Sequence, residues 1–219
     1  VASLSLIGYE KALSDDQIRE IIAAVVQSYV AQVSEFANSL RTKNFALTLS
    51  NTTGKLKHLL EKTRLQTRAK MLDSATLIED YDRRFIFDKT FRPVEDKTRK
   101  EVEAAFHQYL ETIPSAKRFS NVNYRIKDIS VTRGMGIGSA GLRSFNLLLE
   151  GRTQALENDI IIYMKQARPA APSRAVPDVR IQKYFLHNGH RTVISQRALQ
   201  AYADPWLGYT MLDGDGQLV

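Results

Sequence analysis

The spacing of the hydrophobic residues changes near residue 120, and this change constrains the fold more than any other feature. Before it, Ile18, Ile22 and Val25 follow the period of an amphipathic helix, whereas beyond it Phe145 and Leu147 alternate with polar residues as in a half-buried strand. The sequence therefore predicts the α+β class. We expect a helical portion followed by a small, mostly antiparallel sheet with one helix packed against it.

The expected domains are a mainly helical one over residues 1–118 and a sheet-bearing one over residues 119–219. In the first, Ser14 and Gln17 form a capping-box pattern, so a long helix is expected to begin there and to continue to about Ser39. A second helix is expected from about Gly54 to Met71, with four leucines inward: Leu56, Leu59, Leu60 and Leu65. Residues 83–94 read as a short extended or hairpin segment, and a third helix is expected to end before Pro114.

In the second domain, three strands are expected within residues 124–131, 145–149 and 160–165. A proline-rich loop at 168–177 separates them from a helix expected from about Gly189 to Ala203. Two short strands are then expected on either side of the turn at residues 213–216.

A glycine-rich run connects the first two of these strands and indicates a phosphate-binding loop. Glycine lets backbone N–H groups approach an anion without hindrance from Cβ, and the third strand ends at Lys165, whose ammonium would compensate a phosphate charge. The candidate binding residues are Gly134, Gly136, Gly138, Ser139, Gly141 and Lys165.

Several kinds of glycine loop fit this run to different degrees. The Gly136-x-Gly138-x-x-Gly141 spacing matches a dinucleotide-binding loop, but a strand-like segment follows where a helix is needed, and Asp159 begins its strand instead of ending it. A phosphate-loop NTPase would need Lys followed by Ser or Thr after Gly141, and Leu142-Arg143 stands there. The order strand, loop, strand, strand with lysine agrees best with the protein-kinase arrangement. A tight turn without a ligand stays open as an alternative.

In a kinase, an acid on the following helix orients the lysine. The segment from His190 to Gln200 has no Asp or Glu, so Gln196 is the expected partner of Lys165, through a neutral hydrogen bond.

His187 and His190 have a spacing that a metal site can use, but no carboxylate motif accompanies them and a helix start is favoured. We predict no protein-only metal site. The chain has no cysteine, which excludes disulfides and thiolate ligands.

The positive charge is concentrated in one part of the chain. The net charge is +7, and residues 41–70 contain eight basic residues and one acid, Glu61, while the rest is balanced. Such a segment is typical of a solvated helix face, and it is also a candidate surface for nucleic acid or an acidic partner. The basic residues are Arg41, Lys43, Lys55, Lys57, Lys62, Arg64, Arg68 and Lys70.

No run of about 18 apolar residues and no signal sequence is present, so we expect no membrane partner and a cytoplasmic location. The chain begins in the apolar stretch Val1–Ile7 and stops at Val219, where a strand is expected to begin. We therefore expect it to be an internal fragment of a longer protein.

Several segments together resemble an uncharacterised bacterial family, domain of unknown function twenty-two fifty-two, in order and spacing over roughly residues 120–219. They are Tyr124 to Ile129, Gly134 to Arg143, Leu147 to Gly151, Met164 to Ala167, Asn188 to Val193, Gln196 to Gln200 and Asp204 to Gly208. The helical half is similar more loosely. Upstream motifs of this family, Gly-Asp-x-His-x-x-Asn and Asp-Phe-Asp, do not occur in this chain. They resemble the catalytic loop and metal-binding acids of aminoglycoside-phosphotransferase-like kinases.

The resemblance implies a kinase fold with its two lobes in permuted order, in which residues 119–219 resemble the N-lobe. It implies ATP and Mg²⁺ as ligands, the glycine run and Lys165 as the phosphate site, and catalytic acids outside this chain. The expected function is the nucleotide-binding part of a kinase-like phosphotransferase with an unknown phosphoryl acceptor. A non-catalytic kinase-like pseudoenzyme, and a binding module that uses residues 41–70, are the alternatives.

Overall fold

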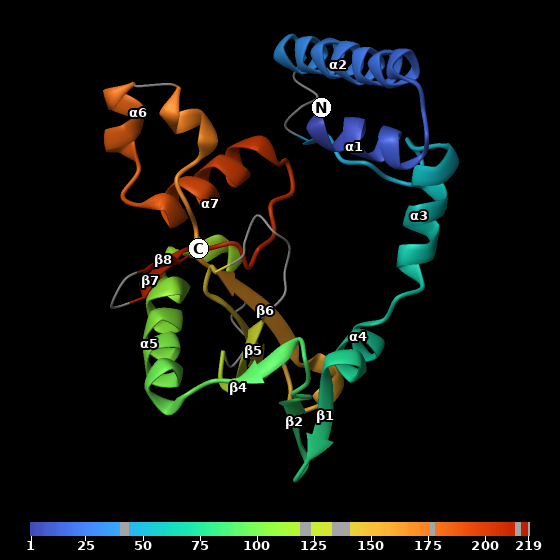
Figure 1. Ribbon diagram of the computed structural model, residues 1–219. Coiled ribbons are helices and arrows are strands. Elements are labelled where there is room, and N and C mark those ends of the chain that lie inside the picture. The colour runs from blue at the N-terminus through green and yellow to red at the C-terminus, as the bar shows by residue number, and fades with distance from the viewer. Residues whose placement is uncertain (40–43, 119–123, 133–140, 176–177, 213–215, 219) are drawn as a thin grey trace. The chain divides into compact units, whose positions relative to one another are not determined.

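The computed structural model of the protein describes residues 1–39, 44–118, 124–132, 141–175, 178–212 and 216–218 (Figure 1). The chain divides into two compact units, Val1–Ala46 and Leu47–Val219. Its architecture is mixed α+β, as predicted, with helices and antiparallel sheets. The predicted domain boundary after residue 118 is not the boundary between these two units, which lies after Ala46. The division into domains at residue 118 stays a prediction.

The first unit is a pair of helices, α1 (Ala2–Glu10) and α2 (Asp15–Ala37). The predicted capping box is confirmed, because the Ser14 side chain accepts a hydrogen bond from the backbone N–H of Gln17, and the Gln17 side chain accepts one from that of Ser14. The buried residues of the two helices are Gly8 and Ile18. Most large apolar side chains of α2 are exposed, including Ile21, Val25, Tyr29 and Val33.

The second unit begins with two helices where one was predicted. They are α3 (Gly54–Arg64) and α4 (Arg68–Ala75). The break occurs because the Thr67 side chain accepts a hydrogen bond from the backbone N–H of Lys70 and so caps a new helix. The inward placement of the leucines is also wrong, since α3 has no buried residue and Leu65, beyond its end, is 81% exposed.

A four-stranded antiparallel sheet forms the centre of the second unit. Its order is β3 (Phe91–Pro93), β4 (Ile126–Thr132), β5 (Ser144–Leu149) and β6 (Ile160–Lys165), so the three strands predicted after residue 124 are confirmed. The remaining strands pair as β1 (Thr76–Glu79) with β2 (Asp82–Phe85) and β7 (Thr210–Leu212) with β8 (Gly216–Leu218). Residues 83–94 therefore form no hairpin of their own. Their two strands pair with β1 and with β4.

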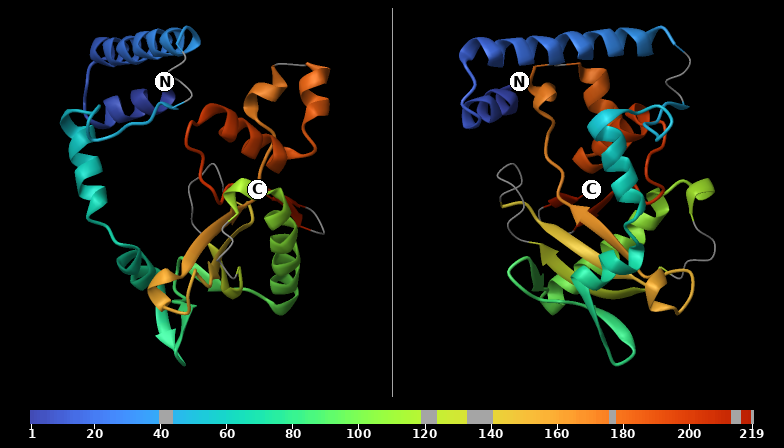
Figure 2. Two further views of the ribbon diagram at one scale, coloured as in Figure 1. Left: turned by 180° about the vertical axis from the view of Figure 1, so that it is seen from behind. Right: turned by 90° about the vertical axis from the view of Figure 1, so that its right-hand side faces the viewer.

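The helix α5 (Asp96–Thr112) lies along one face of the four-stranded sheet (Figure 2). It buries Val102, Ala105, Phe106 and Tyr109 in one core with alternate residues of the strands, including Ile129, Phe145, Leu147, Leu149 and Met164. The predicted end before Pro114 is confirmed. No helix in the described part of the chain has the length and apolar character needed to cross a lipid bilayer.

Short helices connect these elements: η2 (Ser115–Lys117), η4 (Leu156–Asn158) and η5 (Ala171–Arg174). Beyond them are α6 (Val179–Tyr184) and α7 (Asn188–Leu199). The helix predicted from about Gly189 thus begins one residue earlier and ends at Leu199. Its N-cap is His187, whose ring Nδ1 accepts a hydrogen bond from the backbone N–H of His190, so the two histidines do form a helix start.

Candidate functional site

The strand register places Lys165 beside the end of the glycine-rich connection. This connection runs between β4 and β5, which are antiparallel neighbours, and β6 pairs with β5 so that Lys165 lies opposite Ser144. The backbone N–H of Gln166 donates to the carbonyl of Arg143 at 2.9 Å, and the backbone N–H of Arg143 donates to the side-chain oxygen of Gln166 at 3.2 Å. The described end of the glycine run is therefore fixed next to the lysine.

Gly141 is the only proposed loop residue that the structure describes. Its φ is +78°, in the left-handed region that favours glycine, and a Cβ there would have no neighbour within 4 Å. The residue is required for its backbone conformation and not for close packing. Gly134, Gly136, Gly138 and Ser139 lie outside the described residues, so their arrangement stays a prediction.

Alternation along the strands gives the sheet one apolar face and one polar face near this end. The apolar face packs on α5. On the opposite face, the strand register brings together side chains from β4, β5 and β6, because every second residue of a strand points to the same side. We call this set the polar face; its members are Ser130, Thr132, Ser144, Asn146, Tyr163 and Lys165. Farther along the same face, Leu148 and Ile161 pack with Leu72 and Phe85 in a second apolar cluster.

Hydrogen bonds connect the buried members of the polar face. The amide nitrogen of Asn146 donates to the hydroxyl of Ser130 at 3.2 Å and also to that of Thr132, and the Ser144 hydroxyl donates to the carbonyl of Thr132 at 3.1 Å. Ser130 is fully buried and Asn146 is 7% exposed. These bonds fix the four side chains in place, so this part of the polar face is a buried, internally satisfied polar network beside Lys165. The alternation of Ser144 and Asn146 with apolar residues was its signal in the sequence, although neither residue was proposed for the site.

Lys165 is half-buried at the edge of this face, and among the described residues no carboxylate lies within ion-pair distance of it. Its expected partner Gln196 donates its amide hydrogen to the side-chain oxygen of Gln200 at 3.2 Å. No hydrogen bond joins Gln196 to Lys165 in the described structure.

A second group of charged side chains lies at the other end of β4, and the sequence reading did not identify it. The Lys127 ammonium is 2.6 Å from Oδ1 of Asp82 and 2.7 Å from Oδ2 of Asp159. The side chains of Lys127 and Asp159 are 3% and 1% exposed. Because Asp82 belongs to β2 and Asp159 directly follows η4, this lysine ties the β1–β2 hairpin and the η4 segment to the sheet.

Burial and charge act in opposite directions on the two carboxyl groups. Burial, together with the charge of Asp82, raises the pKa of Asp159 despite Lys127, and Oδ1 of Asp159 has no hydrogen-bond partner in the described structure. Burial also acts to raise the pKa of Asp82, but hydrogen bonds from Lys127 and from the backbone of Arg83 outweigh it, and the pKa is lowered. Since both carboxyl groups already share one ammonium, the group serves as an internal tie and not as a binding site.

Among the described residues, no three His, Asp or Glu side chains are grouped so that they could hold a metal ion. The comparison with protein families gives a match over residues 1–219 to the model described as "Uncharacterized protein conserved in bacteria (DUF2252)". No curated protein and no solved structure gives a significant match.

Proposed function

We propose a function for this chain, which belongs to the bacterial family DUF2252. Since the description of that family names no activity, the proposal starts from the geometry of the chain. The function is nucleotide binding through phosphate, as part of a kinase-like phosphotransferase. The observation that carries it is the register that sets Lys165, without a carboxylate partner in the described structure, beside the end of a glycine-rich connection.

A phosphate group suits this position for electrostatic reasons. The ammonium of a half-buried lysine without a counter-ion in the described structure favours an anion, and successive glycine N–H groups supply donors that no Cβ shields. The hydroxyl and amide groups of Ser130, Thr132, Ser144 and Asn146 are buried and bonded to one another, so they support the strand ends and leave Lys165 as the charged member that a phosphate can reach. A polyphosphate would lie between the loop and the end of β6, with Lys165 against its oxygens.

The kinase-like assignment rests on topology. A glycine-rich hairpin between antiparallel strands, followed by a third strand with the lysine, is the order found in protein kinases. Gln196 is the proposed helical residue beside the lysine, and its side-chain oxygen, which is not used in the donation from its amide nitrogen to Gln200, would accept a hydrogen bond from the Lys165 ammonium. The phosphoryl acceptor is not identified by the polar face.

The described residues fit the nucleotide better than they fit its metal. ATP is normally bound with Mg²⁺, which takes oxygen ligands from phosphates, water and one or two carboxylates. The carboxylate that follows the polar face in register, Asp128 of β4, already accepts hydrogen bonds from the backbone N–H of Phe85 and from the guanidinium of Arg99. We therefore assign the nucleotide phosphates to this chain and derive no step through Mg²⁺.

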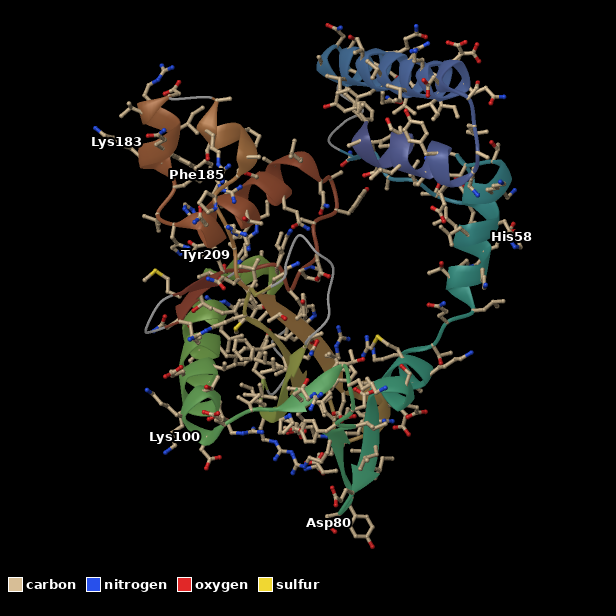
Figure 3. All side chains as sticks on the ribbon, viewed as in Figure 1. His58, Asp80, Lys100, Lys183, Phe185 and Tyr209 are labelled. Carbon is tan, nitrogen blue, oxygen red and sulfur yellow. The ribbon has the colours of Figure 1, made fainter. Side chains whose placement is uncertain are left out.

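The test is calorimetric titration of the full chain with Mg-ATP, in the wild type and in Lys165→Met. Removal of one charged hydrogen bond to phosphate should weaken binding by about 10- to 100-fold, because such a bond contributes about 1.5–3 kcal/mol. Lys100→Met is the matched control. Lys100 is an exposed lysine of α5 (Figure 3) and its substitution removes the same charge.

Equal weakening by Lys165→Met and Lys100→Met would indicate a general charge effect and would refute the site. Absence of Mg-ATP binding to the folded wild type would do the same. Binding without phosphoryl transfer, in the complete gene product, would favour the pseudoenzyme alternative over the kinase.

The basic segment supports a second candidate function, binding of nucleic acid or an acidic partner. Its described basic residues are all exposed, and none of them takes part in an ion pair in the described structure: Lys55, Lys57, Lys62, Arg64, Arg68 and Lys70. Arg41 and Lys43 lie outside the described residues. Charges that are not neutralised within the protein are available to a polyanion.

Binding to a duplex DNA and to a single-stranded RNA, measured at increasing salt, tests this function. Counter-ion release predicts that affinity falls steeply, with a slope that decreases when Lys57 and Lys62 are both changed to Gln. Affinity that does not depend on salt, or no binding at low salt, would exclude it.

A further inference from the structure

A pocket of about 600 Å³ lies apart from the polar face, between η5, α6 and the N-terminal half of α7. It belongs entirely to the second unit. Phe185, at the junction of α6 and α7 (Figure 3), is part of its wall together with Ile181 and Pro172. A volume of this size is in the range of small-molecule sites, which are about 300–1,000 Å³.

Arg191 of α7 is the charged residue of this pocket. One terminal nitrogen, Nη2, donates to the carbonyl of Arg168 at 2.8 Å and to the hydroxyl of Thr192 at 3.1 Å. Its Nε is buried and has no hydrogen-bond acceptor in the described structure. Among the described residues, no Asp or Glu lines the pocket and none forms an ion pair with Arg191.

The buried Nε is out of a ligand's reach, but a fixed guanidinium that lines a pocket and has no carboxylate partner in the described structure indicates a ligand that accepts hydrogen bonds and carries negative charge. Arginine presents its donors in a planar fork that matches carboxylate and phosphate oxygens. The bond from Nη2 to Arg168 holds the fork in place, so part of the entropic cost of ordering this side chain is already met in the free protein.

His187 supplies a second donor to the same pocket. Its Nδ1 accepts the backbone N–H of His190, so in the neutral ring the proton resides on Nε2. Burial, and the neighbouring His190, lower the pKa of His187, which favours this neutral form. The N-terminal end of α7 adds a partial positive charge to this side of the pocket.

The opposite wall is apolar. Ile181, Phe185 and Pro172 contribute side chains without hydrogen-bonding groups, while Ser195 lies on the α7 side with Arg191. A ligand that fills the pocket would therefore place an acidic group against α7 and a hydrophobic body against α6 and η5.

We propose that this pocket binds a small organic anion, a carboxylate or a phosphate ester with an apolar body, through Arg191. The site is separate from the proposed nucleotide site and does not depend on it. The chain links them closely, since Arg168, which anchors Arg191, is three residues beyond Lys165 and these residues span at most about 11 Å.

The experiment titrates the full chain with phenyl phosphate, benzoate and inorganic phosphate, by calorimetry. We expect phenyl phosphate or benzoate to bind at least about tenfold more tightly than inorganic phosphate, because a phenyl ring gains contact with the apolar wall. The tighter of the two identifies the acidic group. Arg191→Gln should weaken that binding about 10- to 100-fold.

Two further variants keep the test decisive if Arg191→Gln does not fold. Ile181→Asp changes a half-exposed residue of the wall and puts a carboxylate beside the ligand, so it should also weaken binding by tenfold or more. Lys183→Gln, on the same helix but outside the pocket, is the control and should bind as the wild type does (Figure 3).

The variant Lys165→Met separates this proposal from the nucleotide site. Anion binding that persists in Lys165→Met and weakens in Ile181→Asp supports the pocket, even if Mg-ATP does not bind at all. Anion binding that weakens in Lys165→Met alone, or that is equal for phenyl phosphate, benzoate and inorganic phosphate, would overturn it. So would the absence of binding by either organic anion.

Discussion

Replacement of Lys127 by Met tests whether the buried ion pairs hold the β1–β2 hairpin and the η4 segment on the sheet. Met has a similar length without the charge, so the change leaves Asp159, at 1% exposure, without its counter-ion. Removal of one partner of a buried pair typically costs about 3–5 kcal/mol, because the remaining charge is not solvated.

The protonation of Asp159 sets a ceiling on this cost. A carboxyl group with the ordinary pKa of 3.8 must take up a proton at pH 7, which costs about 4 kcal/mol at 1.36 kcal/mol per pH unit. In the variant, the pKa of Asp159 in the folded state lies farther above its value in the unfolded chain. The folded state then binds the extra proton, so the variant should become more stable as the pH falls from 7 to 5.

Urea unfolding followed by the fluorescence of Trp206 measures the effect in the second unit alone. Trp206 is the single tryptophan of the chain, and it packs against Tyr124 and the core next to α5. The double variant Lys127→Met, Asp159→Asn should regain most of the lost stability, because a neutral amide needs no counter-ion. Lys100→Met, an exposed lysine, is the control and should change stability by less than about 0.5 kcal/mol.

A loss below about 1 kcal/mol in Lys127→Met would refute the reasoning, since it would show that Asp159 is not buried with its charge. The reasoning would fail equally if the double variant were no more stable than the single one. Either result would show that the ion pairs of Lys127 with Asp82 and Asp159 contribute no more to stability than solvent-exposed ion pairs do.

Two smaller changes test other parts of the second unit. In Gly151→Ala the new Cβ would lie 1.9 Å from the carbonyl oxygen of Asn158, so thermal unfolding should show a loss of about 1–3 kcal/mol, greater than that of Gly141→Ala, where only the positive φ is strained. Equal losses in these two variants would contradict the tight contact. Burial and His190 lower the pKa of His187 below 6.5 in the folded protein, so stability is complete above that pH and is lost as the pH falls through the lowered pKa. His187→Asn keeps a capping residue without this titration, and its unfolding midpoint should vary less between pH 7 and pH 5 than that of the wild type.

The elements that the sequence predicted correctly depend on local signals. The capping box at Ser14 needs only residues three apart, and the alternation in β5 is visible within six residues. The end of α5 before Pro114 is likewise local.

The features that were missed depend on contacts between distant residues. Nothing near Lys127 indicates that Asp82 and Asp159 are its partners. The β1–β2 hairpin is local, but it was missed because its two turn residues with positive φ, Asp80 and Tyr81, include no glycine to mark the turn. The helix break at Thr67 was missed because residues 54–71 are compatible both with one continuous helix and with two helices. The hydrogen bond from the backbone N–H of Lys70 to the Thr67 side chain favours the second arrangement. Of the candidate site, the position of Lys165 next to the loop could be predicted from strand order, whereas Arg191 could be recognised only from the pocket around it.

The six residues of β5 are all buried, and the strand is bonded to β4 on one side and to β6 on the other. Its backbone amides can therefore meet solvent deuterium only when the sheet separates, so their exchange rates report the opening of the whole second unit. In α2, where Ile18 is the buried residue, amides open turn by turn. The amides of β5 and those of α2 should thus differ by orders of magnitude in the time for which they retain their hydrogens.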